Sequence, residues 1–424
     1  MTLNEEVKSS GKWIALILCV LSSVVINIPY LGYSTALPQI MLDLNINYTQ
    51  ASILSSATAL TAGIGVLFGG ILADKWGPAR SVTFALLWLA IGQIIFAFMP
   101  SYSLILATRM FIGLGVTLIF AGTMAVVVRW FEGTNHMGVG VGGLLSSDGL
   151  GGMFSLYGYA FILSYFGWRT GSAIGAAVVF AMFLICYFYL REHPSYYQEE
   201  KEKKLHPVNN TEQTGFKRWV SIVMQKNVLI PACFIIGYIG ANAVIVYWIP
   251  TILQEQGWSS ELAGFISALY PFVGIAGALA SGSISDRVGK KKPLVLISGL
   301  GMAASFIVSA IAIGAGQYTL LAAMLPIAGF CAYIGSPLVY IWAANAVGVK
   351  NVATANGFIL AAGFLIGGTL YPFVCGYLKD ILGTYSSGFM AAAISLVILN
   401  VIIPLFADDT NEFVTDDENK AIAN

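Results

Sequence analysis

The sequence predicts an all-α integral membrane protein, with twelve transmembrane helices in two pseudo-symmetric six-helix bundles. Hydrophobic residues make up 57% of the chain and charged residues 10%, against roughly 45–50% and about 25% in an average soluble protein. Long apolar runs recur, and one charged, glycine-containing turn occurs twice, 212 positions apart. Such a chain cannot cover itself with a polar surface, so lipid is its expected solvent.

The repeated turn occupies positions 70–80 and 282–292. Its first copy reads G-I-L-A-D-K-W-G-P-A-R and its second reads G-S-I-S-D-R-V-G-K-K-K. At the same offset Pro38 falls on Pro250, so the repeat extends beyond a single turn into the neighbouring helices. The chain is therefore predicted to be a duplicated membrane bundle.

Twelve segments are apolar enough to cross a bilayer, which takes roughly 20 residues each. The interval 293–349 contains no charged residue, and we divide it at 314–317 because a single span cannot be that long. Helices are expected throughout, because a backbone inside hydrocarbon has to satisfy its own hydrogen bonds. The predicted spans are approximately 13–36, 50–73, 82–99, 104–128, 137–164, 169–190, 228–252, 262–284, 293–315, 319–343, 352–376 and 386–406.

The distribution of basic residues predicts the orientation. Of the 21 Lys and Arg residues, all but three fall on one side; Arg169 and Lys379 fall on the other, and Arg109 lies within a span. Positive charge marks the cytoplasm, so both termini are expected there, in a multi-pass protein of the plasma (inner) membrane. The expected parts are an N-terminal bundle (1–191), a cytoplasmic linker (192–225), a C-terminal bundle (226–407) and an acidic cytoplasmic tail (408–424).

The two turns resemble the signature loop of the major facilitator superfamily, G-x-L-x-D-[RK]-x-G-x-x-[RK], at its usual places after the second and eighth spans. The resemblance implies the major facilitator fold and secondary transport by alternating access. It also implies that the loops latch the two halves together on the cytoplasmic side and hold the outward-open form. The alternative interpretation is that the loops only supply the positive charge that marks the cytoplasmic side. The implied latch residues are Gly70, Asp74, Lys75, Gly77, Arg80, Gly282, Asp286, Arg287, Gly289 and Lys290.

Two ionisable residues lie well inside the predicted spans, Arg109 and Asp148. A charge at mid-membrane costs about 2.5–3.5 kcal/mol on insertion scales, so such residues usually pair or line an aqueous path. Arg109 begins R-M-F-I-G-L-G, which resembles the R-x-x-x-G-x-G element tied to proton or anion coupling in many family members. Asp148 stands where a related exporter element has proline, which disfavours an antiporter. It is either a protonatable coupling residue or a structural partner of Arg109.

Polar side chains on the expected cavity-lining helices are further candidates for substrate contact. On the first span Ser23, Asn27, Tyr30 and Ser34 have the spacing of one helical face. A helix–helix hydrogen bond of about 0.6 kcal/mol is an equally good interpretation of each polar residue alone. The candidate substrate or coupling residues are Arg109, Asp148, Asn27, Tyr30, Tyr238, Asn242, Tyr270, Tyr333, Tyr340 and Asn356.

The sequence predicts no enzyme. Its three histidines are scattered and no phosphate-binding glycine loop is present, so no cofactor, metal or nucleic acid is expected. Because Arg109 is the cation at depth, we expect a monomeric secondary transporter that carries a small organic anion, such as a carboxylate, by proton symport or exchange. The alternatives are a proton-coupled exporter of amphipathic compounds or drugs and a membrane nutrient sensor that does not transport.

Overall fold

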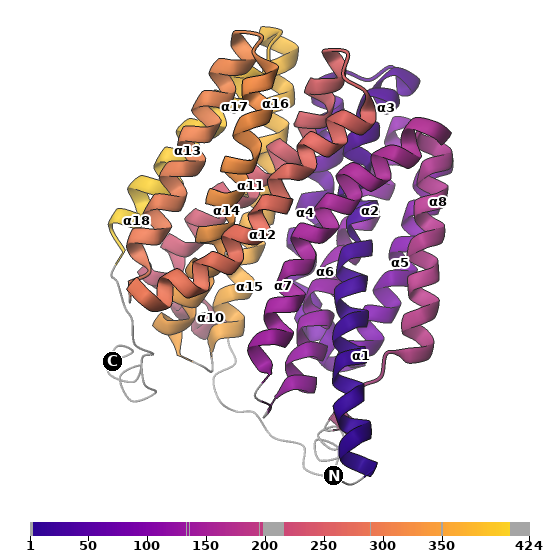
Figure 1. The fold of residues 1–424 in the computed structure, drawn as a ribbon, viewed down its shortest axis with the longest axis vertical. Coiled ribbons are helices and arrows are strands. Elements are labelled where there is room, and N and C mark those ends of the chain that lie inside the picture. The colour runs from indigo at the N-terminus through magenta and orange to yellow at the C-terminus, as the bar shows by residue number, and fades with distance from the viewer. Residues whose placement is uncertain are drawn as a thin grey trace.

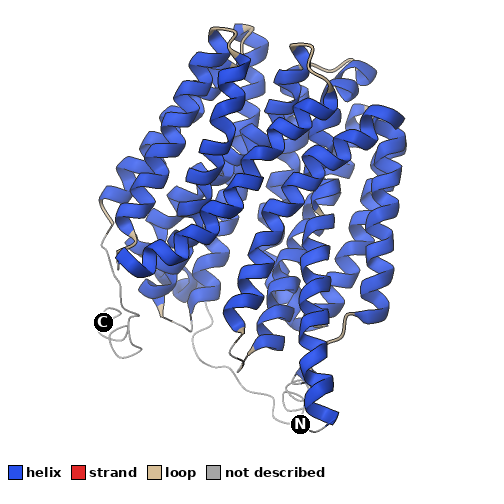
Figure 2. Ribbon diagram, viewed as in Figure 1, coloured by secondary structure: helices blue, strands red, loops and turns tan. Residues whose placement is uncertain are grey.

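The protein is entirely helical in the part of the chain that its structure, a computed structural model, describes (Figure 2). The described residues are 3–132, 134, 136–194, 196–197, 216–288, 290–348 and 351–407. Within them, only the backbone is described at 3–10, 70–75, 216–218, 282–283 and 285–288. Most of the predicted linker and the predicted acidic tail lie outside these ranges.

The N-terminal bundle contains six crossings, of which the first and fifth change helix type midway. Its elements are α1 (Leu3–Val25), α2 (Asn27–Leu31), the 3₁₀ helix η1 (Gly32–Ala36), α3 (Leu37–Leu44), α4 (Tyr48–Trp76), α5 (Pro78–Phe98), α6 (Tyr102–Phe131), α7 (Met137–Met153), the π-helix η2 (Phe154–Gly158) and α8 (Tyr159–Tyr189).

The C-terminal bundle follows after the short helix α10 (Phe216–Val223). Its elements are α11 (Lys226–Glu255), α12 (Ser260–Val288), α13 (Lys292–Gly314), α14 (Tyr318–Val347), α15 (Val352–Ala362), the π-helix η4 (Gly363–Gly368), α16 (Thr369–Leu382), α17 (Ser386–Leu396), the π-helix η5 (Val397–Ile402) and α18 (Ile403–Leu405). The predicted division at 314–317 is confirmed.

The internal duplication is visible in the helix boundaries. Helices α4 and α12 both have 29 residues, and both ends differ by the 212 positions that separate the repeated turns. Figure 1 shows the two bundles side by side, with α7 and α12 crossing at the front. Equal length and register in corresponding helices confirm the pseudo-symmetric architecture.

The described helices include eleven that are long and apolar enough to span a membrane, against twelve predicted. The difference arises at Met137–Tyr189, a run of 53 residues that counts once. Gly167 interrupts this run with φ 70° and ψ 167°, and the chain ascends through α7 and descends along α8 (Figure 1). The predicted spans 137–164 and 169–190 are the two arms of this run.

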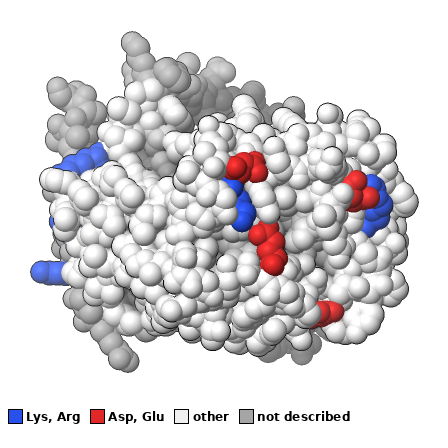
Figure 3. Space-filling model, turned by 90° about the horizontal axis from the view of Figure 1, so that it is seen from above, with Lys and Arg blue, Asp and Glu red and all other residues white. Residues whose placement is uncertain are grey.

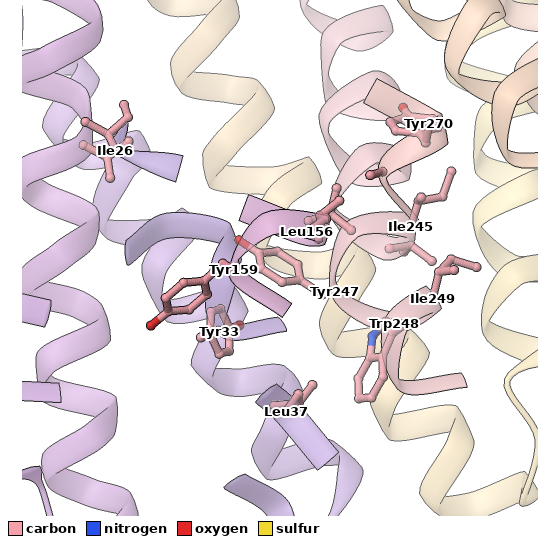
Figure 4. Close-up of a cluster of buried hydrophobic side chains, with 14 of the residues drawn as sticks. Ile26, Tyr33, Leu37, Leu156, Tyr159, Ile245, Tyr247, Trp248, Ile249 and Tyr270 are labelled. Carbon is pink, nitrogen blue, oxygen red and sulfur yellow. The ribbon is translucent and has the colours of Figure 1, made fainter. Parts of the chain in front are cut away.

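The two bundles meet through close backbone approaches at small residues. A Cβ atom on Gly149 of α7 would lie 2.3 Å from the Ile275 side chain and 2.9 Å from the Pro271 carbonyl oxygen, both on α12. Aromatic side chains also pack between the bundles: Tyr33 and Tyr247 lie next to each other in Figure 4, with ring centroids 5.6 Å apart and ring planes inclined at 45°. Contacts between the halves thus combine glycine packing with buried rings.

The start of α1 lies at the bottom of the molecule in Figure 1, and α18 forms the lower end of the last crossing, which descends from the top. The opposite face, which we call the outer face because the positive-inside rule predicts cytoplasmic termini, carries the ends of α3 and α16. Seen from above, this face is largely uncharged, and its few acidic and basic side chains occur in small groups (Figure 3).

Candidate functional site

Asp148 lies on the glycine-rich helix α7 and bonds to the other bundle. Its Oδ2 accepts a hydrogen bond of 3.2 Å from the hydroxyl of Tyr333, which stands near the middle of the 30-residue helix α14. Asp148 itself is half-buried. The predicted carboxylate at depth is therefore held inside the protein, at a point where the N-terminal and C-terminal bundles touch.

Three tyrosines of the C-terminal bundle gather beside Asp148. The ring centroid of Tyr333 lies 5.8 Å from that of Tyr238 on α11 and 6.1 Å from that of Tyr270 on α12, both edge to face. Gly274 makes this possible, because a Cβ atom there would lie 2.6 Å from the Tyr333 ring. We call Tyr238, Tyr270 and Tyr333 the tyrosine cluster.

The hydroxyl group of Tyr270 is buried within the tyrosine cluster and differs from that of Tyr333 in its hydrogen bonding. The side chain is 1% exposed, and its buried oxygen has no hydrogen-bond partner among the described residues. A buried hydroxyl normally finds a partner, because leaving it unpaired costs free energy. Tyr270 therefore keeps an unused hydrogen-bonding group within the tyrosine cluster.

Arg109 lies on α6, fully buried, and binds the backbone of the first crossing. Its Nη1 donates to the Pro29 carbonyl oxygen at 2.6 Å and its Nη2 to that of Tyr30 at 3.0 Å. The guanidinium carbon lies 3.8 Å from the ring centroid of Tyr33. Because Pro29 and the 3₁₀ segment interrupt the regular helix here, backbone carbonyl groups at membrane depth need hydrogen-bond donors from other helices. Arg109 supplies two of these bonds.

Arg109 and Asp148 are not joined in this conformation, since each has its own partners. The guanidinium bonds to carbonyl groups of α2, and the carboxylate accepts from α14. The two predicted charges thus differ in burial: the Asp148 carboxylate is half-buried, and the Arg109 guanidinium is fully buried.

The remaining candidates fall into two groups. Asn27 is a packing residue: it is 1% exposed, and its amide donates to the Ser23 carbonyl oxygen at 2.9 Å. The others are half-buried in the interior, and the ring of Tyr30 lies 6.5 Å from that of Phe364 in the opposite bundle. This half-buried group consists of Tyr30, Asn242, Tyr340 and Asn356.

The first crossing does not follow the predicted single helical face. Regular helix ends at Val25, and α2, η1 and α3 follow in place of one continuous helix. The helical spacing predicted for Ser23, Asn27, Tyr30 and Ser34 therefore holds only up to the break, and Ser34 is fully buried. The physical reason is Pro29, which cannot donate a backbone hydrogen bond inside a helix.

The structure describes only three of the predicted latch residues with their side chains: Gly77 and Arg80 in the first loop, and Lys290 in the second. The described part contains an acid that the sequence analysis did not single out. Glu192, just after α8, accepts from the backbone N–H of Ala79 at 2.8 Å and of Arg80 at 3.1 Å. Gly77, at φ 96°, leaves room for this carboxylate.

Glu192 is 8% exposed and lies outside the membrane-spanning helices. Burial raises the pKa of Glu192 above its ordinary value of 4.5, although the N–H groups of Arg80 and Ala79 and the charges of Arg80 and Arg129 oppose the increase. An acid directly after an apolar span, among basic residues, was the signal that could have identified it. Its carboxylate holds the N-terminus of α5.

The family is decided by a match to nearly the whole length of the chain. The model of the Major Facilitator Superfamily matches residues 14–359 and 240–421. The chain belongs to this superfamily. Its members are transporters and not enzymes, and this member is a multi-pass membrane protein with the major facilitator fold.

Relatives and solved structures agree with this membership. The chain is 26% identical to the hexuronate transporter of Bacillus subtilis (strain 168) over 394 residues, covering 88% of this chain and 90% of the relative. It is 24% identical to the 4-hydroxybenzoate transporter PcaK of Pseudomonas aeruginosa over 366 residues, covering 78% of each.

Among solved structures, the xylose transporter XylE of E. coli in a partially occluded inward-open conformation matches with a TM-score of 0.75 at 14% identity, covering 96% of this chain and 100% of that one. An inward-facing, unoccupied bacterial homologue of the human lysosomal transporter Spinster matches with a TM-score of 0.74 at 15% identity, covering 93% and 96%. At these identities the likeness concerns the fold.

Proposed function

We propose that this major facilitator protein imports small organic anions together with protons, and that Asp148 accepts the proton. The observation that carries the proposal is the hydrogen bond from Tyr333 to Asp148, which links the two bundles inside the membrane. A carboxylate at that depth is energetically costly, so one that is present usually has a function, and proton relays are among the usual functions.

The charge of Asp148 explains how proton and substrate binding are coupled. Two negative charges in a site of low dielectric constant repel each other strongly. An anionic substrate therefore binds better after Asp148 is protonated, and a bound anion in turn favours the proton. This mutual preference is reciprocal by thermodynamic necessity.

The tyrosine cluster supplies neutral donors for the substrate. The unpartnered hydroxyl of Tyr270 and the hydroxyl of Tyr333, once released from Asp148, can both donate to a carboxylate. The buried charge of Arg109 bonds to carbonyl groups and forms no ion pair among the described residues. Its positive potential favours an anion without direct contact.

The relatives support the same substrate class. Four of the matched transporters are named for hexuronate, 4-hydroxybenzoate, sulfoacetate and tartrate, in each case an organic acid. Their identities of 23–26% support the class of substrate more than any one compound.

Uptake into proteoliposomes tests the proposal. The purified chain is reconstituted with an acidic exterior and offered radiolabelled glucuronate, 4-hydroxybenzoate, xylose and choline. We expect accumulation of one or more acids, abolished by a protonophore and by Asp148→Asn. Uptake of only the neutral sugar or the cation, or accumulation that ignores the pH gradient, would overturn the proposal.

A further inference from the structure

Asp380, at the end of α16, binds the beginning of α4 in the opposite bundle. Its Oδ2 accepts from the backbone N–H of Thr49 at 2.7 Å and also from the Thr49 hydroxyl, and its Oδ1 accepts from the N–H of Tyr48 at 3.2 Å. The first amides of a helix have no partner within the helix, and its dipole favours a negative charge there. Both carboxylate oxygens of Asp380 are thus used to cap a helix of the other half.

Neighbouring side chains of the C-terminal bundle surround this contact. The Lys379 Nζ lies 3.8 Å from the Glu255 carboxylate and 5.2 Å from the ring centroid of Tyr48. The hydroxyl of Tyr385 donates to Glu255 at 2.7 Å, and the ring centroids of Tyr385 and Tyr48 lie 5.7 Å apart. The first residue of α4 is therefore enclosed by groups that belong to the opposite bundle.

Two further observations show that the halves are close at this end. The Gln254 side chain of α11 donates to the Thr35 carbonyl oxygen of η1 at 3.0 Å. A Cβ atom on Gly376 of α16 would lie 2.6 Å from the Tyr48 carbonyl oxygen. The outer ends of the bundles are joined in this conformation.

We propose that Asp380 is an outer latch, which holds the outer face closed and opposes the latch expected on the cytoplasmic side. Helices α4 and α16 run in opposite directions, so the start of α4 meets the end of α16. The end of α4, which contains Asp74, lies at the other face, as does the start of α15. Helix α4 and the crossing formed by α15, η4 and α16 therefore each carry an acid near their end, Asp74 at the inner face and Asp380 at the outer face. Asp380 caps the start of α4 here, and we expect the Asp74 latch to act at the start of α15 when the inner face is closed.

Rocking the bundles brings one pair of helix ends together and separates the other. The two latches therefore alternate: the Asp380 latch is engaged when the outer face is closed, and the Asp74 latch when it is open. This inference rests on alternating access, but it does not depend on the substrate or on protons.

Distances between spin labels test the outer latch. The native cysteines are replaced, and nitroxides are placed at the exposed positions Ser101 and Gln317, in outer connections of opposite bundles. A second pair at the exposed positions Glu132 and Lys290 reports on the inner face. The full chain is measured in nanodiscs by pulsed electron spin resonance, without substrate or pH gradient, so that the result is independent of the proposed transport reaction.

In Asp380→Asn we expect the ratio of outer-closed to outer-open molecules to fall about fivefold, because the amide keeps only one acceptor oxygen and loses the negative charge that the helix dipole favours. The outer distance lengthens and the inner distance shortens. Thr49→Val, which removes one donor and leaves the helix intact, gives a smaller shift in the same direction. Asp74→Asn gives the opposite shift.

The matched control is Asp43→Asn on the same face. Asp43 pairs with Arg169 at 2.8 Å, and both belong to the N-terminal bundle, so its loss should leave both distances unchanged. The outer latch is refuted if Asp380→Asn behaves like this control. A longer outer distance without a shorter inner one would refute the alternation, because the outer face would then open without closure of the inner face.

Discussion

Tyr333 of the C-terminal bundle donates a hydrogen bond to Asp148 of the N-terminal bundle, with 3.2 Å between the hydroxyl oxygen and Oδ2. The two residues are 185 positions apart in the chain. Because the bond crosses from one bundle to the other, the protonation of Asp148 acts on the contact between the halves. A proton on Asp148 removes the negative charge that Tyr333 stabilises.

Asp148→Asn should separate uphill transport from exchange. The amide mimics the protonated carboxyl group and cannot release a proton, so accumulation driven by a pH gradient should fall to background. Exchange of labelled for unlabelled substrate should stay within about threefold of the wild-type rate, because the charge that repels the anion is absent. Paired uptake and counterflow assays in proteoliposomes measure both. Full accumulation in this variant would contradict a proton-accepting role.

Arg109→Lys should impair the conformational cycle more than substrate affinity. A lysine ammonium cannot reproduce the planar pair of bonds from one guanidinium to the Pro29 and Tyr30 carbonyls. Hydrogen bonds from charged groups contribute about 1.5–3 kcal/mol, so the melting temperature should fall by several degrees. The maximal uptake rate should drop about tenfold while KM changes less than about threefold. A large rise in KM at an unchanged maximal rate would identify Arg109 as a direct substrate ligand.

Glu192→Gln should change how stability depends on pH. Burial raises the pKa of Glu192 above its ordinary value of 4.5, so the folded protein holds this proton more tightly than the unfolded chain. The stabilisation is fully present below the ordinary value and is lost as pH rises through the raised value. The melting temperature of Glu192→Gln in detergent should therefore increase relative to that of the wild type as pH rises from the ordinary pKa of Glu192 through its raised pKa.

The control for Glu192 is Glu132→Gln, which removes the same charge from an exposed position at the end of α6. Its melting temperature should follow that of the wild type across the same pH range. A constant difference between Glu192→Gln and wild type at all pH values would show that the pKa of Glu192 is the same in the folded protein as in the unfolded chain.

The spans and their pairing could be predicted because lipid imposes simple requirements on sequence. A crossing needs a run of apolar residues of fixed length, and a duplicated chain repeats its turns; the equal offsets of α4 and α12 follow from both. The division between α13 and α14 could be placed on length alone, since no helix can remain in a bilayer over the whole uncharged interval.

The partners of the buried charges could not be predicted in the same way. Arg109 binds backbone carbonyls, and every residue has one, so no residue type marks Pro29 or Tyr30 as its partner. Asp148 bonds to Tyr333 only because the folded bundles bring these two side chains of α7 and α14 within hydrogen-bonding distance. The break in the first crossing also moves Ser34 out of the predicted stripe. Sequence spacing indicates which residues share a face only while the helix stays regular.

Tyr270→Phe should lower substrate affinity without lowering stability. The Tyr270 hydroxyl is buried and has no partner among the described residues, so its removal sacrifices no hydrogen bond in the protein and relieves an unpaired polar group. If the hydroxyl donates to the substrate carboxylate, KM should rise about tenfold, as expected for a bond to a charged group. The melting temperature should stay the same or increase.

The control for Tyr270 is Tyr371→Phe. The Tyr371 hydroxyl is hydrogen-bonded to that of Ser395 within the C-terminal bundle, so the same change should lower the melting temperature and leave KM unaltered. Measured together, the two variants distinguish a hydroxyl kept for the substrate from one that joins helices. If Tyr270→Phe destabilises the protein and leaves KM unchanged, the hydroxyl serves packing, and the carboxylate of the substrate must be bound elsewhere in the interior.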